Sequence, residues 1–93
     1  MRFVLTFTLK QESRNAAISR FLETGGMPPQ GAKLLGRWTR QDLAGGFLLL
    51  ESEDPKALAG FARDWSDVCD LALTPVVEDA ELTEVLKAAG KRK

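Results

Sequence analysis

The chain has 93 residues, with 13 basic and 13 acidic side chains that cancel to a net charge of zero. A chain of this length forms one domain with a modest core, and its balanced charge excludes a general attraction to nucleic acid or to an anionic membrane. The chain has no histidine and no tyrosine, and its single cysteine, Cys69, excludes a disulfide scaffold. Without the commonest zinc ligand, we expect neither a metal nor a cofactor.

The first third of the chain predicts a strand and a helix. Residues 2–10 alternate between a wholly apolar face and a face of small β-branched residues, which is typical of a strand. This stretch is too short to span a membrane, and with the lone cysteine it favours a cytoplasmic protein. Ser13 can cap a helix that Gly25 then ends. The apolar face of this helix consists of Ala17, Ile18, Phe21 and Leu22.

The middle of the chain predicts two strands and a second helix. Residues 33–40 contain two arginines, which suits an edge strand. Residues 47–52 are an apolar run typical of a strand that is covered on both faces. Asp54 can cap the helix that follows, with proline at its first position. Gly60 within this helix is unfavourable, so we expect it to allow close packing.

The last third predicts a strand and a short helix. Residues 68–77 alternate as a strand, and Pro75 places that strand at an edge because proline donates no hydrogen bond to a neighbour. Asp79 can cap a third helix over residues 80–89, which Gly90 would end. Residues 1–90 are thus expected to form a single domain, and residues 91–93 a disordered basic tail.

The element order predicts a ferredoxin-like α+β fold, a βαββαβ sandwich with an extra C-terminal helix. In this arrangement the first and third strands are central, and they are the two most apolar ones here. Two helices cover one face of the sheet, with Leu48 and Leu50 directed towards them. Phe47 and Leu49 lie on the other face and need cover. A second copy of the chain would supply this cover, or else the third helix would fold over the face.

Several segments together resemble a family of short bacterial domains of unknown function that belongs among the dimeric α/β-barrel proteins. The resemblance covers residues 3–79 and brings no activity. It implies the ferredoxin-like fold and a homodimer that closes a shared barrel. The segments that carry it are Gly36-Arg37-Trp38, Gly46 to Ser52 with Asp54-Pro55, Trp65-Ser66-Asp67 and Thr74 to Val77.

Four residues are candidates for a ligand site in the barrel cleft: Thr6, Arg37, Trp38 and Glu51. Glu51 ends the apolar strand and could act as a base, or it could simply lie in water or pair with Arg37. Arg37 could hold an anionic group, and as an edge-strand charge it could equally prevent sheet-to-sheet pairing. Trp38 could line a pocket for a planar molecule or contribute to an interface.

These observations favour a protein that binds a small apolar or aromatic molecule in the cleft of a homodimer. Two alternatives stay open. In the first, the protein is a cofactor-free isomerase or oxygenase that uses Glu51 as its base. In the second, it is a structural or interaction module whose barrel is filled. An open cavity of a few hundred cubic ångströms with convergent polar groups would separate a binder or an enzyme from a filled module.

Overall fold

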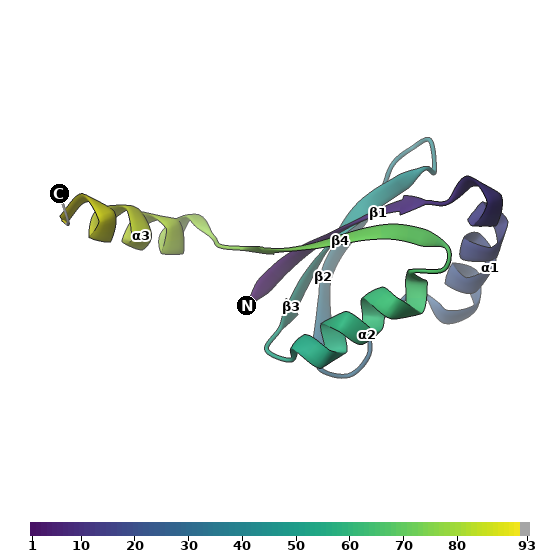
Figure 1. Cartoon of the computed structure of the whole chain (residues 1–93), viewed down its shortest axis with the longest axis horizontal. Coiled ribbons are helices and arrows are strands. Elements are labelled where there is room, and N and C mark those ends of the chain that lie inside the picture. The colour runs from purple at the N-terminus through teal and green to yellow at the C-terminus, as the bar shows by residue number, and fades with distance from the viewer. Residues whose placement is uncertain (92–93) are drawn as a thin grey trace.

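The computed structural model describes residues 1–91 and contains a four-stranded sheet, three α-helices and one short 3-10 helix. Figure 1 shows α2 lying along the sheet, α1 at one end of it and α3 extending away from the other end. The elements in chain order are β1 (Arg2–Leu9), η1 (Gln11–Ser13), α1 (Arg14–Thr24), β2 (Ala32–Thr39), β3 (Gly45–Ser52), α2 (Pro55–Trp65), β4 (Cys69–Val76) and α3 (Asp79–Lys91).

The sheet has the strand order β2-β3-β1-β4, and all its neighbours are antiparallel. This order confirms the ferredoxin-like fold with its extra C-terminal helix. It also confirms that β1 and β3 are central and that β4, which contains Pro75, lies at an edge. Two glycines allow β3 to approach its neighbours closely, because a Cβ on Gly46 would lie 2.1 Å from the Trp38 carbonyl oxygen.

The core lies on the face of the sheet that α2 covers. Leu5 of β1 pairs with Leu48 of β3, and both are buried with Leu50 against Leu58 and Phe61 of α2. Leu50 is fully buried. The alternation of β3 therefore places its leucines at 48 and 50 towards the helices, as the sequence predicts. A buried leucine of this kind contributes about 1.5–3 kcal/mol to folding.

The ends of α1 and α2 follow the predicted signals in most respects. The Asp54 carboxylate accepts a hydrogen bond from the Lys56 backbone N–H at 2.9 Å, and Pro55 opens α2. Gly25 ends α1 in the left-handed region, with φ 72°. Ser13 occupies the N-cap position of α1, but its side-chain oxygen is buried with no partner among the described residues.

Four expectations about the helices are wrong. A Cβ on Gly60 would meet nothing within 4 Å, so this glycine allows no close packing. Asp79 is the first residue of α3 rather than its cap, and α3 continues through Gly90 to Lys91, with residues 92–93 outside the described part. The alternative in which α3 folds over its own sheet is also contradicted, because every residue from 79 to 90 is exposed.

Within residues 1–91, no helix combines the length and the apolar character that crossing a membrane requires.

Candidate functional site

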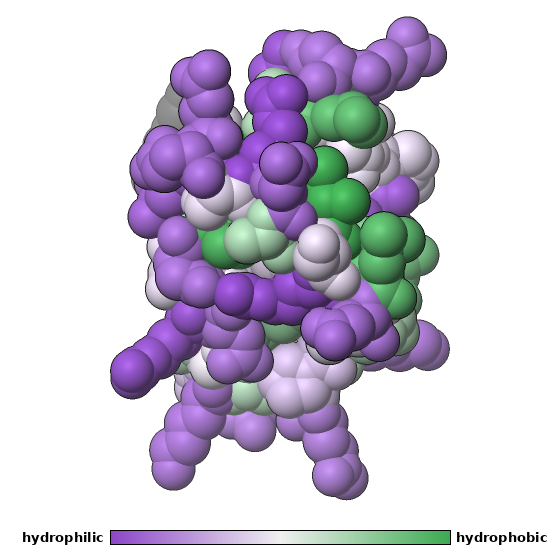
Figure 2. Space-filling view, turned by 90° about the vertical axis from the view of Figure 1, so that its right-hand side faces the viewer, coloured by the Kyte–Doolittle hydropathy of each residue, from purple (hydrophilic) through white to green (hydrophobic). Residues whose placement is uncertain are grey.

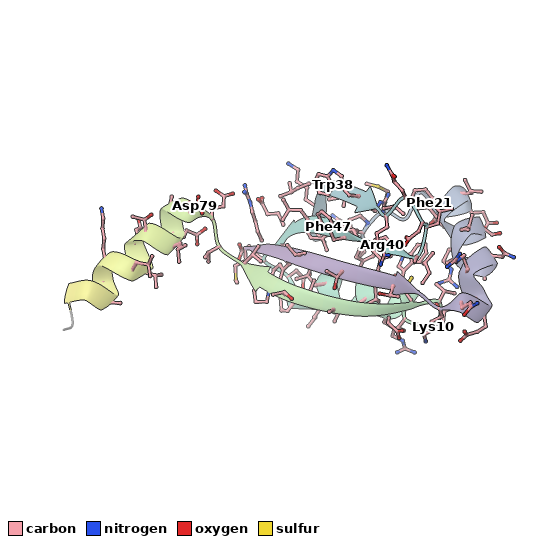
Figure 3. The ribbon with its side chains drawn as sticks, turned by 90° about the horizontal axis from the view of Figure 1, so that it is seen from above. Lys10, Phe21, Trp38, Arg40, Phe47 and Asp79 are labelled. Atoms are coloured by element: carbon pink, nitrogen blue, oxygen red, sulfur yellow. The ribbon has the colours of Figure 1, made fainter. Side chains whose placement is uncertain are left out.

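Three of the four predicted site residues share the face of the sheet that the helices leave open. Thr6 lies opposite Phe47 across β1 and β3, and Phe47 lies opposite Trp38 across β3 and β2. The rings of Trp38 and Phe47 stack with centroids 5.1 Å apart and planes inclined by 25° (Figure 3). About half of each ring residue is exposed, 53% for Trp38 and 45% for Phe47. This row forms an apolar surface on the open face.

Glu51 lies on the same open face but at the far end of β3. It is four positions away from Phe47, which corresponds to about 13 Å along a strand. Its carboxylate pairs with Arg2, with 3.4 Å between Oε2 and the arginine Nε, and about half of the glutamate side chain is exposed. Lys33 lies opposite Glu51 on β2. Glu51 is thus a paired surface carboxylate of the isolated chain, and its partner is Arg2 rather than Arg37.

Arg37 lies on the other face of the sheet, where β2 meets the end of α1. Its guanidinium donates to the carbonyl oxygens of Gly26 and Gly25 at 2.7 and 2.8 Å and lies 4.8 Å from the centroid of the Phe21 ring. Cations favour the negative end of a helix dipole. Burial lowers the pKa of Arg37. The structure therefore separates Arg37 from Thr6, Trp38 and Glu51 and gives it a role at the α1 C-terminus.

A cavity of about 360 Å³ opens between the helices and the sheet, on the same side as Arg37. Its walls come from α1, α2, all four strands and the turn between β2 and β3. Figure 2 looks onto the end of the molecule at which α1 lies and shows hydrophobic side chains exposed between hydrophilic ones. The residues that line the cavity are Leu5, Phe7, Leu9, Ala17, Ile18, Phe21, Gly26, Arg37, Thr39, Leu43, Leu48, Phe61, Trp65, Cys69 and Leu71.

The few polar groups on the cavity wall differ in kind. Arg37 supplies hydrogen-bond donors only, and Thr39 supplies a hydroxyl group. Cys69 is buried, and that burial raises the pKa of its thiol, as expected for a cysteine that acts as a small apolar residue. No carboxylate belongs to the residues that line the cavity.

An arginine–aspartate pair holds the helical wall of the cavity in place. Arg20 of α1 donates two hydrogen bonds to the Asp67 carboxylate, at 2.9 and 2.7 Å, and one to the Asp64 carbonyl oxygen at 2.7 Å. Its guanidinium also lies 5.3 Å from the centroid of the Trp65 ring. The hydrogen bond from Arg20 lowers the pKa of Asp67 to about 2. This pair fixes α1 against the turn that follows α2.

Of the residues that line the cavity, the sequence pattern marks only Arg37 as a candidate ligand contact, and it places the predicted binding cleft on the opposite face of the sheet. Phe21 and Trp65 have the helical spacing of core positions, and nothing in a periodic pattern distinguishes a filled core from an unfilled one. One signal was available. Arg37 and Trp38 are adjacent in a strand, and adjacent residues point to opposite faces, so both could not line one cleft.

The fold and the cavity define a class, a small ferredoxin-like α+β domain with an apolar pocket between its helices and its sheet. A family model described as a domain of unknown function, DUF3303, matches residues 1–90, and the chain belongs to this family. No curated protein matches it. A solved structure described as an uncharacterized NIPSNAP domain protein from Burkholderia xenovorans is similar, with 12% identity and a TM-score of 0.47 over 85% of this chain and 97% of that chain.

Proposed function

We propose that this protein binds a small apolar or aromatic molecule in the cavity between its helices and its sheet, within a homodimer formed through the open sheet face. The observation that carries the binding proposal is the cavity itself. Its volume of about 360 Å³ lies within the range of roughly 300–1,000 Å³ that is typical of ligand pockets. Its walls are aromatic and aliphatic, with a small number of polar groups to orient a ligand.

The charge of the cavity wall restricts the class of ligand. Arg37 is the one cationic residue that lines the cavity, and it can only donate hydrogen bonds. A ligand with a carbonyl or carboxylate oxygen at one end would be favoured there, because a guanidinium matches such acceptors. A cationic ligand would be opposed by Arg37 and would find no carboxylate among the lining residues. We therefore expect an amphipathic molecule with an apolar body and an oxygen acceptor.

The binding test compares three probes of equal chain length by calorimetry: decanoate, decanol and decylammonium. Decanoate is expected to bind most tightly and decylammonium least tightly. The dissociation constants of successive probes are expected to differ by about tenfold or more, which corresponds to about 1.4 kcal/mol. Equal affinities for all three would contradict the role of Arg37. No binding of any probe would contradict the proposed function and favour a structural or interaction module.

A matched pair of variants on α1 locates the bound probe. Ala17 is buried on the cavity wall, whereas its neighbour Ala16 is exposed. Ala17→Leu fills part of the cavity and is expected to weaken decanoate binding at least about tenfold, although overpacking also costs about 1–3 kcal/mol of stability. Ala16→Leu is expected to leave binding unchanged. Thr39→Phe, at an exposed position of the wall, provides a second blocking variant that leaves the packed core alone.

The homodimer half of the proposal is supported by the open sheet face. Trp38 and Phe47 form a stacked pair there that is about half exposed in the single chain. Monomeric proteins rarely leave large apolar patches in water, and aromatic residues are enriched at interfaces. The same face carries Thr6, so the row of Thr6, Phe47 and Trp38 would meet its counterpart in the partner. On this proposal Trp38 acts as an interface residue rather than as a ligand contact.

A further inference from the structure

The C-terminal helix α3 has an apolar face that its own chain leaves uncovered. Leu82, Val85, Leu86 and Ala89 recur at i, i+3, i+4 and i+7, which places them along one side of the helix. Val85 and Leu86 are each 60% exposed, and Leu82 is 43% exposed. In Figures 1 and 3 the helix continues beyond the end of the sheet and lies over neither of its faces.

A helix of this length requires a surface to pack against. The helix α3 has 13 residues, and isolated helices shorter than about 12–15 residues are marginal in water. Its internal support consists of ordinary backbone bonds and a bond from the Thr83 hydroxyl to the Asp79 carbonyl oxygen at 2.8 Å. In proteins most helical stability comes from the packing of an amphipathic face. The ordered helix therefore implies an occupant for the apolar face defined above.

The dimensions of the chain indicate how much surface a partner on this helix face could bury. The accessible surface is 6760 Å², whereas a compact monomer of 10.2 kDa exposes about 5,300 Å². The radius of gyration is 15.9 Å, against about 12 Å for a compact domain of this length. The excess surface exceeds the roughly 800 Å² that each partner buries in a standard interface. A second chain of similar size would account for it.

The connection between β4 and α3 is short, and α3 leads away from its own sheet (Figure 1). Only residues 77–78 separate β4 from α3, and Glu78 forms an ion pair with Arg2 at the beginning of β1. The Leu82 backbone N–H donates to the Glu78 carbonyl oxygen at 2.9 Å, which ties the first turn of the helix to the same residue. In this position every residue from 79 to 90 is exposed, so another molecule would have to supply the contact for the apolar face.

We propose that α3 is an exchanged arm, which packs its apolar face against a second copy of this chain while that copy's arm packs against the first. Two copies satisfy each other reciprocally, since each has an uncovered helix that projects beyond the end of its own sheet, and exchange of an identical element is a low-cost route to a dimer. The arm continues directly from β4, which is part of the open sheet face. This inference rests on the proposed homodimer and assigns to it a second contact.

The test measures amide hydrogen exchange and sedimentation of the full chain at micromolar concentration. The wild-type protein is expected to sediment as a dimer with α3 amides protected. Leu86→Asp places a charge in the apolar face and is expected to accelerate exchange in α3 by about 100-fold while the strands stay protected, since α3 adds nothing to its own chain's core. Ala80→Asp adds the same charge on the opposite side of the helix and is expected to change neither measurement.

The possible results distinguish the exchanged arm from the dimer that forms through the sheet face. A dimer with unprotected α3 amides would overturn the exchanged arm and leave the sheet-face dimer intact. A monomer with protected α3 amides would overturn both, because the helix would then pack on its own chain. In a mixed sample of isotope-labelled and unlabelled chains, contacts between copies detected by nuclear magnetic resonance at the methyl groups of Leu82, Val85 and Leu86 are expected. Their absence in a protected dimer would also contradict the exchange.

Discussion

Gly60 occupies the middle of α2 with open space around it. Glycine in a helix interior is about 1 kcal/mol less favourable than alanine, and a Cβ here would meet nothing within 4 Å. We expect Gly60→Ala to raise the free energy of unfolding by about 1 kcal/mol in urea denaturation. Gly46→Ala is the contrasting variant, because its Cβ would lie 2.1 Å from the Trp38 carbonyl oxygen. A destabilised Gly60→Ala variant would show that the exposed side of α2 has a partner.

Leu43 adopts a left-handed backbone conformation, with φ 62°, in the turn between β2 and β3. Such a conformation costs a leucine on the order of 1 kcal/mol, and its side chain lines the cavity. Leu43→Gly and Leu43→Ala remove the same apolar contact, but only glycine also relieves the strain. We expect the glycine variant to be more stable than the alanine variant by about 1 kcal/mol in thermal denaturation. Equal stabilities would mean that the strain is absent in solution.

At the scale of the elements, most of the fold can be predicted from the sequence, because the strands and helices follow from local patterns of apolar and capping residues. Alternation in β1 and β3 identifies Leu5, Leu48 and Leu50 as core residues, and Asp54-Pro55 places the start of α2. The face that Trp38 occupies could not be predicted, because a register shift between Leu34 and Gly36 breaks the alternation of β2. The cavity could not be predicted either, since it depends on how far α1 lies from the sheet.

The pair between Arg20 and Asp67 joins two elements and makes their docking depend on pH. The folded protein holds the pKa of Asp67 at about 2, below its ordinary value of 3.8. A lowered pKa stabilises the fold above the unfolded value, and this contribution is lost as the pH falls from about 4 towards 2. We expect the melting temperature to drop across this range in thermal scans followed by circular dichroism.

Substitution of the aspartate tests the origin of that pH dependence. Asp67→Asn is expected to melt at a lower temperature than the wild type at neutral pH and to lose less stability between pH 4 and 2. Glu23→Gln, on the exposed side of α1, removes a carboxylate outside the pair and is expected to keep the wild-type profile. If the wild type and Asp67→Asn lose stability in parallel below pH 4, other carboxylates carry the acid transition.

At the scale of the whole molecule, the two faces of the sheet present different groups. The helix side has a cavity and the polar groups Arg37 and Thr39, while the open side presents the row of Thr6, Phe47 and Trp38. Binding and association are thus expected to respond to different substitutions. Ala17→Leu is expected to weaken probe binding in a protein that still sediments as a dimer, whereas a change in the open-face row is expected to act on assembly.

Trp38→Lys tests the open face as the dimer interface. Trp38 belongs to the edge strand β2 and is half exposed, so the single chain tolerates a lysine there, but a charge in the centre of an apolar interface is costly. We expect the dimer dissociation constant to rise by at least about 100-fold, which corresponds to about 2.8 kcal/mol, in sedimentation. Leu22→Lys is the matched control, since Leu22 is 78% exposed on α1. A Trp38→Lys variant that dimerises as tightly as Leu22→Lys would move the interface away from the open face and leave the exchanged α3 arm as the principal contact between the copies.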